Sequence, residues 1–198
     1  GRAELESERQ SEYNATHGAV SKVKGQGLPT VENLALALSC PFRSVLTSGF
    51  PIRLMEFGRL ADDEMRRLRK LLKRDFGIRD AADVSSVLEE LEEAHDEEDN
   101  LPRSIFLAGL NLLTSAVDVG YLPFCKVEPL CREKINFIST NVVSWQQFGL
   151  LFMEGECINN AIGRRFLKKS IRSLLVEESS PWCIFPWESI SKALDSVE

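Results

Sequence analysis

The 198-residue chain contains only two histidines, the residue type that most often acts as a general base near neutral pH. His17 lies in a polar N-terminal stretch, and His95 lies in an acidic run. A serine or cysteine nucleophile normally needs such a base, and the sequence has no GxSxG, GxxxxGKS/T, GxGxxG or HExxH motif. This scarcity argues against an enzyme without excluding one, and we expect no catalytic residue and no cofactor.

The acidic run also contains the arrangement closest to a metal site. Glu92, His95 and Asp99 follow one another at spacings of three and four residues, which places them on one face of a helix. Such a trio is able to hold a divalent cation. Further carboxylates surround it, however, and charge runs usually face solvent. We interpret the run as a solvated helix end and expect no metal site.

Two helical stretches carry basic clusters opposite an apolar stripe. Each cluster is typical of the solvent-facing side of a surface helix, and the alternative is a binding face for an anionic partner, either an acidic protein surface, RNA or the chain's own acidic run. Placed side by side, the clusters would form one patch whose binding weakens with salt. Apart from Phe166, no aromatic residue interleaves with them, and the formal net charge is −6, so we do not expect nucleic-acid binding. The clusters are Arg66, Arg67, Arg69, Lys70, Lys73 and Arg74, and then Arg164, Arg165, Lys168, Lys169 and Arg172.

An aromatic and proline-rich corner lies near the C-terminus. Trp182 and Trp187 stand close together there, and Trp145 opens a helix that we expect to pack nearby. The corner is interpreted as a seal of the helical core. The alternative is a pocket between the Trp145 helix and the Trp182–Trp187 loop. Charge in that pocket would come from Glu154, Glu156, Arg164 and Arg165.

The elements that must position these residues are predicted to be helices. Alternating strand patterns and Asn-Gly or Asp-Gly hairpin signals are missing, so the sequence favours a single compact all-α domain over residues 30–198, preceded by a polar arm or short peripheral helix over residues 1–29. Thr30 is expected to cap a first helix that Pro41 ends. A second predicted helix begins at Asp62 or Asp63 and ends before Gly77, a third runs from Asp80 to Asp99, and a fourth runs from Pro102 to Gly120. A fifth is expected from Pro123 to about Ile138, with a kink or division at Pro129. The last three begin at a Ser144–Gln147 capping box, at Ile162 with an end at Leu175, and at Glu188.

Composition supports this interpretation. With 43% hydrophobic and 27% charged residues the chain resembles an ordinary globular protein. Five widely spaced cysteines predict reduced, mostly buried thiols in a cytoplasmic protein. No apolar stretch approaches the roughly 18–20 residues of a membrane span, so no membrane partner is expected. The chain begins at Gly1 without a leader pattern, which we interpret as a fragment boundary rather than a signal peptide.

The segment Ser144-Trp145-Gln146-Gln147-Phe148-Gly149, followed by Gly155 and by the segment 180–187 with the sequence SPWCIFPW, resembles the signature of a bacterial family, number 1266 in the series of domains of unknown function. The resemblance spans about residues 33–188. It implies a soluble bacterial domain and brings no established activity. Members of that family often carry an Asp and an Arg in the helix before a Gly-Tyr pair, which is Gly120-Tyr121 in this chain. At the corresponding positions this chain has Ala108 to Asn111, with Asp118 as the only nearby acid. If that pair is functional in the family, its absence here argues against shared catalysis.

The sequence as a whole predicts a non-enzymatic helical module that binds another protein. The predicted binding surface is either the aromatic corner or a basic helix face. An enzyme or small-ligand-binding protein with the pocket described above is the alternative. The sequence carries no prediction of oligomeric state.

Overall fold

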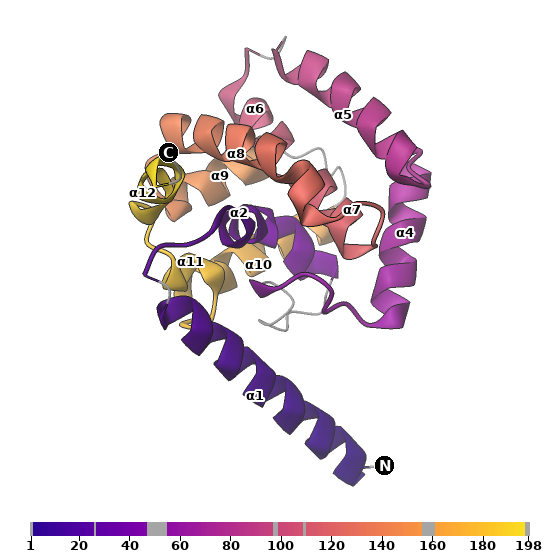
Figure 1. Cartoon of the computed structure of the whole chain (residues 1–198), viewed down its shortest axis with the longest axis vertical. Coiled ribbons are helices and arrows are strands. Elements are labelled where there is room, and N and C mark those ends of the chain that lie inside the picture. Colours follow the sequence, from indigo (N-terminus) through magenta and orange to yellow (C-terminus); the bar gives the residue numbers. More distant parts are fainter. Residues whose placement is uncertain are drawn as a thin grey trace.

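A computed structural model describes residues 2–25, 27–46, 55–96, 99–108, 110–155 and 161–196 of the chain (Figure 1). Helices make up the regular secondary structure of these residues, and no strand occurs among them, which confirms the all-α prediction. The helices are α1 (Arg2–Gly25), α2 (Val31–Leu46), α4 (Asp62–Phe76), α5 (Ala81–Asp96), α6 (Leu101–Leu107), α7 (Asn111–Asp118), α8 (Phe124–Asn141), α9 (Trp145–Gly155), α10 (Ala161–Val176), α11 (Pro181–Ile184) and α12 (Ser189–Asp195). Within these described ranges, none of the helices has both the length and the apolar character that crossing a membrane requires.

The N-terminal helix α1 projects away from the other helices (Figure 1). Its described side chains are mostly exposed, and Tyr13 remains 64% exposed. Only its C-terminal part reaches the core, where Ala19 is buried and Val23 packs against the main hydrophobic cluster. The predicted polar, peripheral character of the arm fits this placement, but α1 is a long helix of 24 residues rather than a short one.

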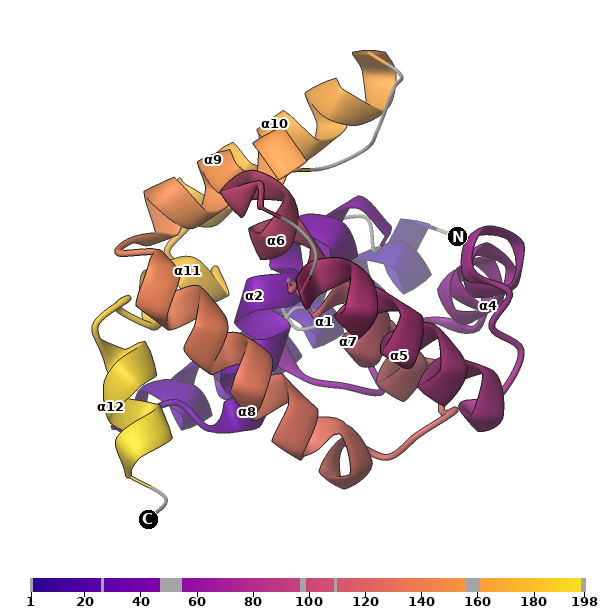
Figure 2. The same cartoon turned by 90° about the horizontal axis from the view of Figure 1, so that it is seen from above.

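Helix α2 lies in the middle of the bundle (Figures 1 and 2) and contacts α7, α8, α10, α11 and α12. Thr30 caps it as predicted, because the Asn33 N–H donates to the Thr30 hydroxyl oxygen at 3.1 Å. The prediction that Pro41 ends the helix is wrong, since α2 continues to Leu46. A helix that is buried on all sides gains enough from packing to tolerate an internal proline, which costs about 3 kcal/mol. Because Pro41 has no N–H, the carbonyl of Ala37 four residues earlier receives no helical hydrogen bond.

Helices α4 and α5 pack beside α7 around the smaller hydrophobic cluster. Helix α4 begins after Ala61, whose N–H donates to the Glu64 carboxylate at 2.9 Å, so neither of the predicted caps Asp62 and Asp63 is the N-cap residue. Gly77 ends α4 in the left-handed conformation with φ 71°, as the sequence predicts. Asp80 accepts hydrogen bonds from two backbone N–H groups in the first turn of α5 and caps it as predicted.

The helix predicted from Pro102 to Gly120 is in fact two helices. Helix α6 ends at Leu107 and α7 starts at Asn111, because Leu110 adopts φ 61° and turns the chain between them. Gly120, with φ 77°, follows α7 as expected. The apolar spacing does not mark this break, because it continues through both helices. The residue type does not mark it either, since a left-handed leucine is rare.

Helices α8 and α9 follow the prediction more closely. Pro129 neither ends nor divides α8, which runs from Phe124 to Asn141 as one helix. At the start of α9 the Gln147 N–H donates to the Ser144 hydroxyl oxygen at 3.1 Å, and the Gln147 side chain accepts from the Val143 N–H at 2.8 Å. The predicted capping box is therefore present, with its return bond one residue earlier than usual.

The described helices bury two hydrophobic clusters. The larger cluster contains residues of α2, α6 and α8–α12, and the smaller contains residues of α4, α5 and α7. Helix α7 joins them, because Leu113 belongs to the larger cluster and Leu112 and Ala116 to the smaller.

Candidate functional site

An open groove with a volume of about 600 Å³ lies between α9 and α10, which run beside each other along one side of the protein (Figure 2). Its apolar lining consists of Leu150 and Met153 from α9 and Leu167 from α10. Leu167 is buried, whereas Leu150 is 56% exposed. Apolar surface is therefore available to a partner in the groove.

The charged lining of the groove is predominantly basic. Helix α9 contributes one carboxylate, Glu154. Helix α10 contributes four cations, Arg164, Arg165, Lys168 and Arg172. Arg164, Lys168 and Arg172 are four residues apart, so the turn of the helix brings them to one face. The described part of the lining therefore carries a net positive charge next to apolar side chains.

The sequence predicted three of these residues together. Glu154, Arg164 and Arg165 all line the groove, although Glu156 lies outside the described residues. The three predicted tryptophans do not line it. Sequence reasoning missed Leu150 and Met153, because the helical period leaves several faces of α9 open to apolar contacts until the position of α10 is known.

The basic face of α4 differs from that of α10. Arg67 pairs with Asp63 at 3.0 Å, Arg74 pairs with Asp75 at 2.5 Å, and Arg69 donates to the Val119 carbonyl at 2.8 Å. Helices α4 and α10 also lie apart in both views, so the two basic faces do not form the single patch considered from the sequence (Figures 1 and 2). The α10 face is therefore the stronger candidate for an anionic partner.

Two apolar residues of α10 occupy an unexpected position. Ile162 and Phe166 are apolar, and yet they are 71% and 58% exposed. The side chains that reach the core are Leu167, Ile171 and Leu174. Because Ile162 and Phe166 are four residues apart, they share a face that is turned away from this core face.

The aromatic corner is filled by its own rings. The Trp145 and Trp182 rings stack with centroids 5.0 Å apart, and the Trp187 ring meets Trp145 edge-on at 4.8 Å. Trp145 and Trp182 are buried, and Trp187 is half-buried. These contacts occupy the space between the Trp145 helix and the Trp182–Trp187 segment.

Each of the three indole N–H groups donates to a backbone carbonyl. Trp182 donates to Ala37 at 2.8 Å, which satisfies the carbonyl that Pro41 leaves open in α2. Trp145 donates to Phe185 at 2.7 Å and Trp187 to Val142 at 3.1 Å. Phe185 and Val142 are the C-cap residues of α11 and α8, where the helical hydrogen bonds end. Trp145 and Trp187 therefore cap helix ends, while Trp182 bonds an open carbonyl inside α2.

Two glycines of α9 allow close packing: Gly149 against Ile171 of α10 and Gly155 against the start of α6. A Cβ atom at Gly149 would lie 2.8 Å from the Ile171 side chain, and one at Gly155 would lie 1.9 Å from the Pro102 carbonyl oxygen. Gly155 also accepts a hydrogen bond from Arg103 at 3.2 Å. The motif residues of this region thus have packing roles in the structure.

A buried ion pair joins α2 to α7, and no sequence pattern predicted it. The Arg43 guanidinium donates to the Asp118 carboxylate, and both side chains are only 2% exposed. Burial lowers the pKa of Arg43 to about 10, so it is still a cation at neutral pH. The Asp118 carboxylate supplies its counter-charge. No local pattern links two residues 75 positions apart.

Other residues considered from the sequence make no site here. No group of three or more potential metal ligands occurs among the described residues, and the side chains of Glu92 and His95 are not among them. Of the four described cysteines, all free, Cys40 and Cys131 are buried while Cys125 and Cys183 are exposed, so burial is less general than expected.

No protein-family model matches the chain, and no curated protein or solved structure is significantly similar to it. The resemblance to the domain family named above stays a prediction.

Proposed function

We propose that this protein is a non-enzymatic interaction module that binds an acidic, amphipathic segment of another protein in the groove between α9 and α10. The observation that carries the proposal is the combination of an exposed apolar surface with four cations and one carboxylate among the described residues that line a single open groove. An amphipathic helix with leucines on one face and carboxylates beside them complements this lining in both apolar character and charge.

The lack of salt bridges at three of the α10 cations supports an acidic protein segment as the partner. No described residue forms a salt bridge with Arg165, Lys168 or Arg172, so an acidic partner does not have to displace an internal carboxylate from them. Leu150 and Met153 add apolar contacts, which favour a protein partner over a nucleic acid because the described lining residues include no aromatic ring for base stacking.

The experiment is a fluorescence-anisotropy titration with a labelled helical peptide that carries leucines on one face and glutamates directly beside them. Lys168→Glu/Arg172→Glu reverses two charges in the groove and is expected to weaken binding about tenfold or more. Its matched control is Arg66→Glu/Lys70→Glu, which makes the same charge change at exposed positions of α4. The control is expected to change affinity less than about twofold, because exposed charges far from the ligand are screened by salt.

A second pair of variants tests the apolar part of the groove. Leu150→Ser is expected to weaken peptide binding severalfold, and Val176→Ser, which alters a 75% exposed residue outside the groove, is expected to leave it unchanged. Equal losses in the two charge-reversal variants would contradict the proposal. Equally tight binding of a single-stranded RNA oligomer would contradict it as well.

A further inference from the structure

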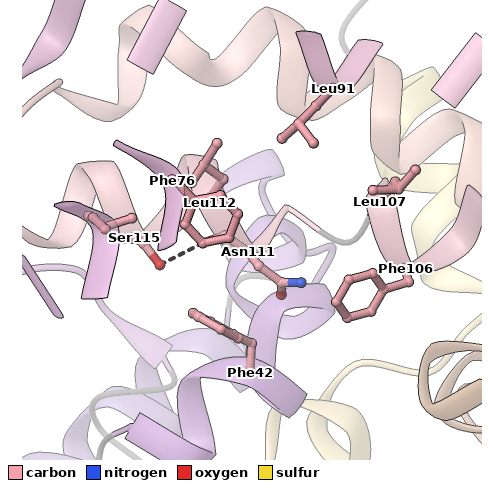
Figure 3. A pocket seen from close by; sticks show the side chains of 9 residues that line it. Phe42, Phe76, Leu91, Phe106, Leu107, Asn111, Leu112 and Ser115 are labelled. Carbon is pink, nitrogen blue, oxygen red and sulfur yellow. Dashed lines mark hydrogen bonds between the residues drawn. The ribbon is translucent and has the colours of Figure 1, made fainter. Parts of the chain in front are cut away.

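A second cavity lies where the two hydrophobic clusters meet, away from the α9–α10 groove (Figure 3). Its volume is about 80 Å³, and helices α2, α4, α5, α6 and α7 all contribute to its lining. The apolar lining includes Phe42, Phe76, Leu91, Phe106, Leu107 and Leu112.

One polar atom in this lining lacks a hydrogen-bond partner. The Asn111 side-chain oxygen Oδ1 is buried and accepts no hydrogen bond from any described residue. Figure 3 shows the Asn111 carboxamide between Phe42 and Phe106. Ser115, the other polar residue of the described lining, donates its hydroxyl proton to the Asn111 backbone carbonyl at 2.6 Å and cannot also satisfy the side chain. Asn111 Oδ1 is closed off from the cavity in this structure, so the carboxamide has to turn before a ligand can reach it. Since a buried acceptor without a donor costs free energy, a ligand that brings a donor favours that turn.

The backbone next to Asn111 is strained. Leu110 has φ 61°, and it is the one non-glycine residue with positive φ among those that the structure describes. This turn separates α6 from α7 and brings Asn111 to the first position of α7, where its side chain lines the cavity. Strain of this kind persists where the surrounding structure enforces it, and it gathers at binding sites.

We propose that this cavity binds a small apolar molecule that carries one O–H or N–H donor, a single-ring compound of the size of phenol. The ring would contact Phe42 and Phe106, and the donor would bind Asn111 Oδ1. The volume is about half that of the ~150 Å³ engineered cavity that accepts benzene. The cavity is partly open to solvent and one of its lining residues, Phe76, is 39% exposed, so a ring can extend beyond the enclosed volume.

Phenol and toluene distinguish a ligand site from an unspecific gap. A purely apolar cavity prefers toluene, because burying the phenol hydroxyl without an acceptor is unfavourable. Titrations of the whole protein followed by ¹H–¹⁵N NMR shifts are expected to show phenol binding about fivefold to tenfold more tightly than toluene, with the largest changes at Asn111 and its neighbours. Asn111→Leu, which keeps a similar shape without the acceptor, is expected to reverse this preference.

The wild-type measurement stands without the variant if Asn111→Leu does not fold. A preference for toluene in the wild-type protein would overturn the proposal, because Asn111 would then not engage the ligand. Absence of saturable binding by either compound would overturn it too, since water would then satisfy the carboxamide. Shift changes centred on α9 and α10 would place the ligand in the other groove and would equally overturn the proposal.

Discussion

Trp182 is predicted to stabilise the fold through both its ring and its indole N–H. The side chain is only 4% exposed and its N–H donates to the Ala37 carbonyl. An aromatic side chain of this kind buries about 150–250 Å², worth roughly 4–6 kcal/mol at about 25 cal/mol per Å². Alanine retains a part of that contribution, so Trp182→Ala is expected to cost about 3–5 kcal/mol in the free energy of unfolding.

The hydrogen bond can be tested separately because Pro41 creates the open carbonyl. Trp182→Phe keeps an aromatic ring but leaves the Ala37 carbonyl without a donor, which costs about 1–3 kcal/mol. Pro41→Ala restores a backbone N–H that is able to donate to Ala37. The cost of Trp182→Phe is therefore expected to be about 1 kcal/mol smaller in the Pro41→Ala protein.

The assay is urea unfolding followed by far-ultraviolet circular dichroism, because removing one of three tryptophans changes the fluorescence signal itself. All four members of the cycle are compared: wild type, each single variant and the double variant. A loss below about 1 kcal/mol for Trp182→Ala would refute the burial argument. A Trp182→Phe cost that is the same in both backgrounds would refute the link between Pro41 and Trp182.

Three further predictions concern other parts of the fold. Gly155→Ala is expected to destabilise the protein by about 1–3 kcal/mol in thermal melts, because the new Cβ would meet the α6 backbone at 1.9 Å. The control Gly18→Ala in α1 is expected to show no such loss, because no atom lies within 4 Å of its new Cβ. Thiol labelling of the native protein at pH 8, mapped by mass spectrometry, is expected to modify the exposed Cys125 quickly and Cys40 only after unfolding, since burial raises the pKa of Cys40 to about 12; equal rates would contradict this. Burial and two neighbouring carboxylates raise the pKa of Glu32, so its charged form opposes folding above that pKa. Glu32→Gln is therefore expected to raise the urea midpoint more at pH 7 than at pH 4. A larger gain at pH 4 would contradict the sign of this pKa shift.

The sequence predicted most elements because their ends are encoded locally. Thr30, Asp80, Ser144 and Gly77 act at helix ends as their types and positions indicate. Such features depend on residues three or four positions apart, and short-range patterns capture them.

The features that the sequence did not predict depend on distant contacts. Pro41 continues α2 because packing around the central helix compensates for the proline, and the open carbonyl of Ala37 is satisfied by Trp182, 145 residues further along the chain. The left-handed Leu110 divides a helix that periodicity presents as continuous. The orientation of α10, which exposes Phe166 and lines the groove with basic residues, depends on the face that meets α2 and α9.

The candidate site shows the same limit. Glu154, Arg164 and Arg165 were predicted as a charged group, and the structure brings them to one groove. Their predicted neighbours, the tryptophans, instead pack against one another and cap helix carbonyls. Composition and spacing identified residues able to bind, but only the packing of α9 on α10 shows which of them share a surface.

A charge-swap titration tests the binding role of the groove most directly. The Lys168→Glu/Arg172→Glu protein is mixed with a version of the helical peptide in which lysines replace the glutamates. Recovery of the affinity to within a few fold of the original pair is the predicted result, because the complementary charges then face each other in the same groove. Failure of the swapped peptide to bind the reversed protein, while that protein still folds as wild type by circular dichroism, would contradict binding at this groove.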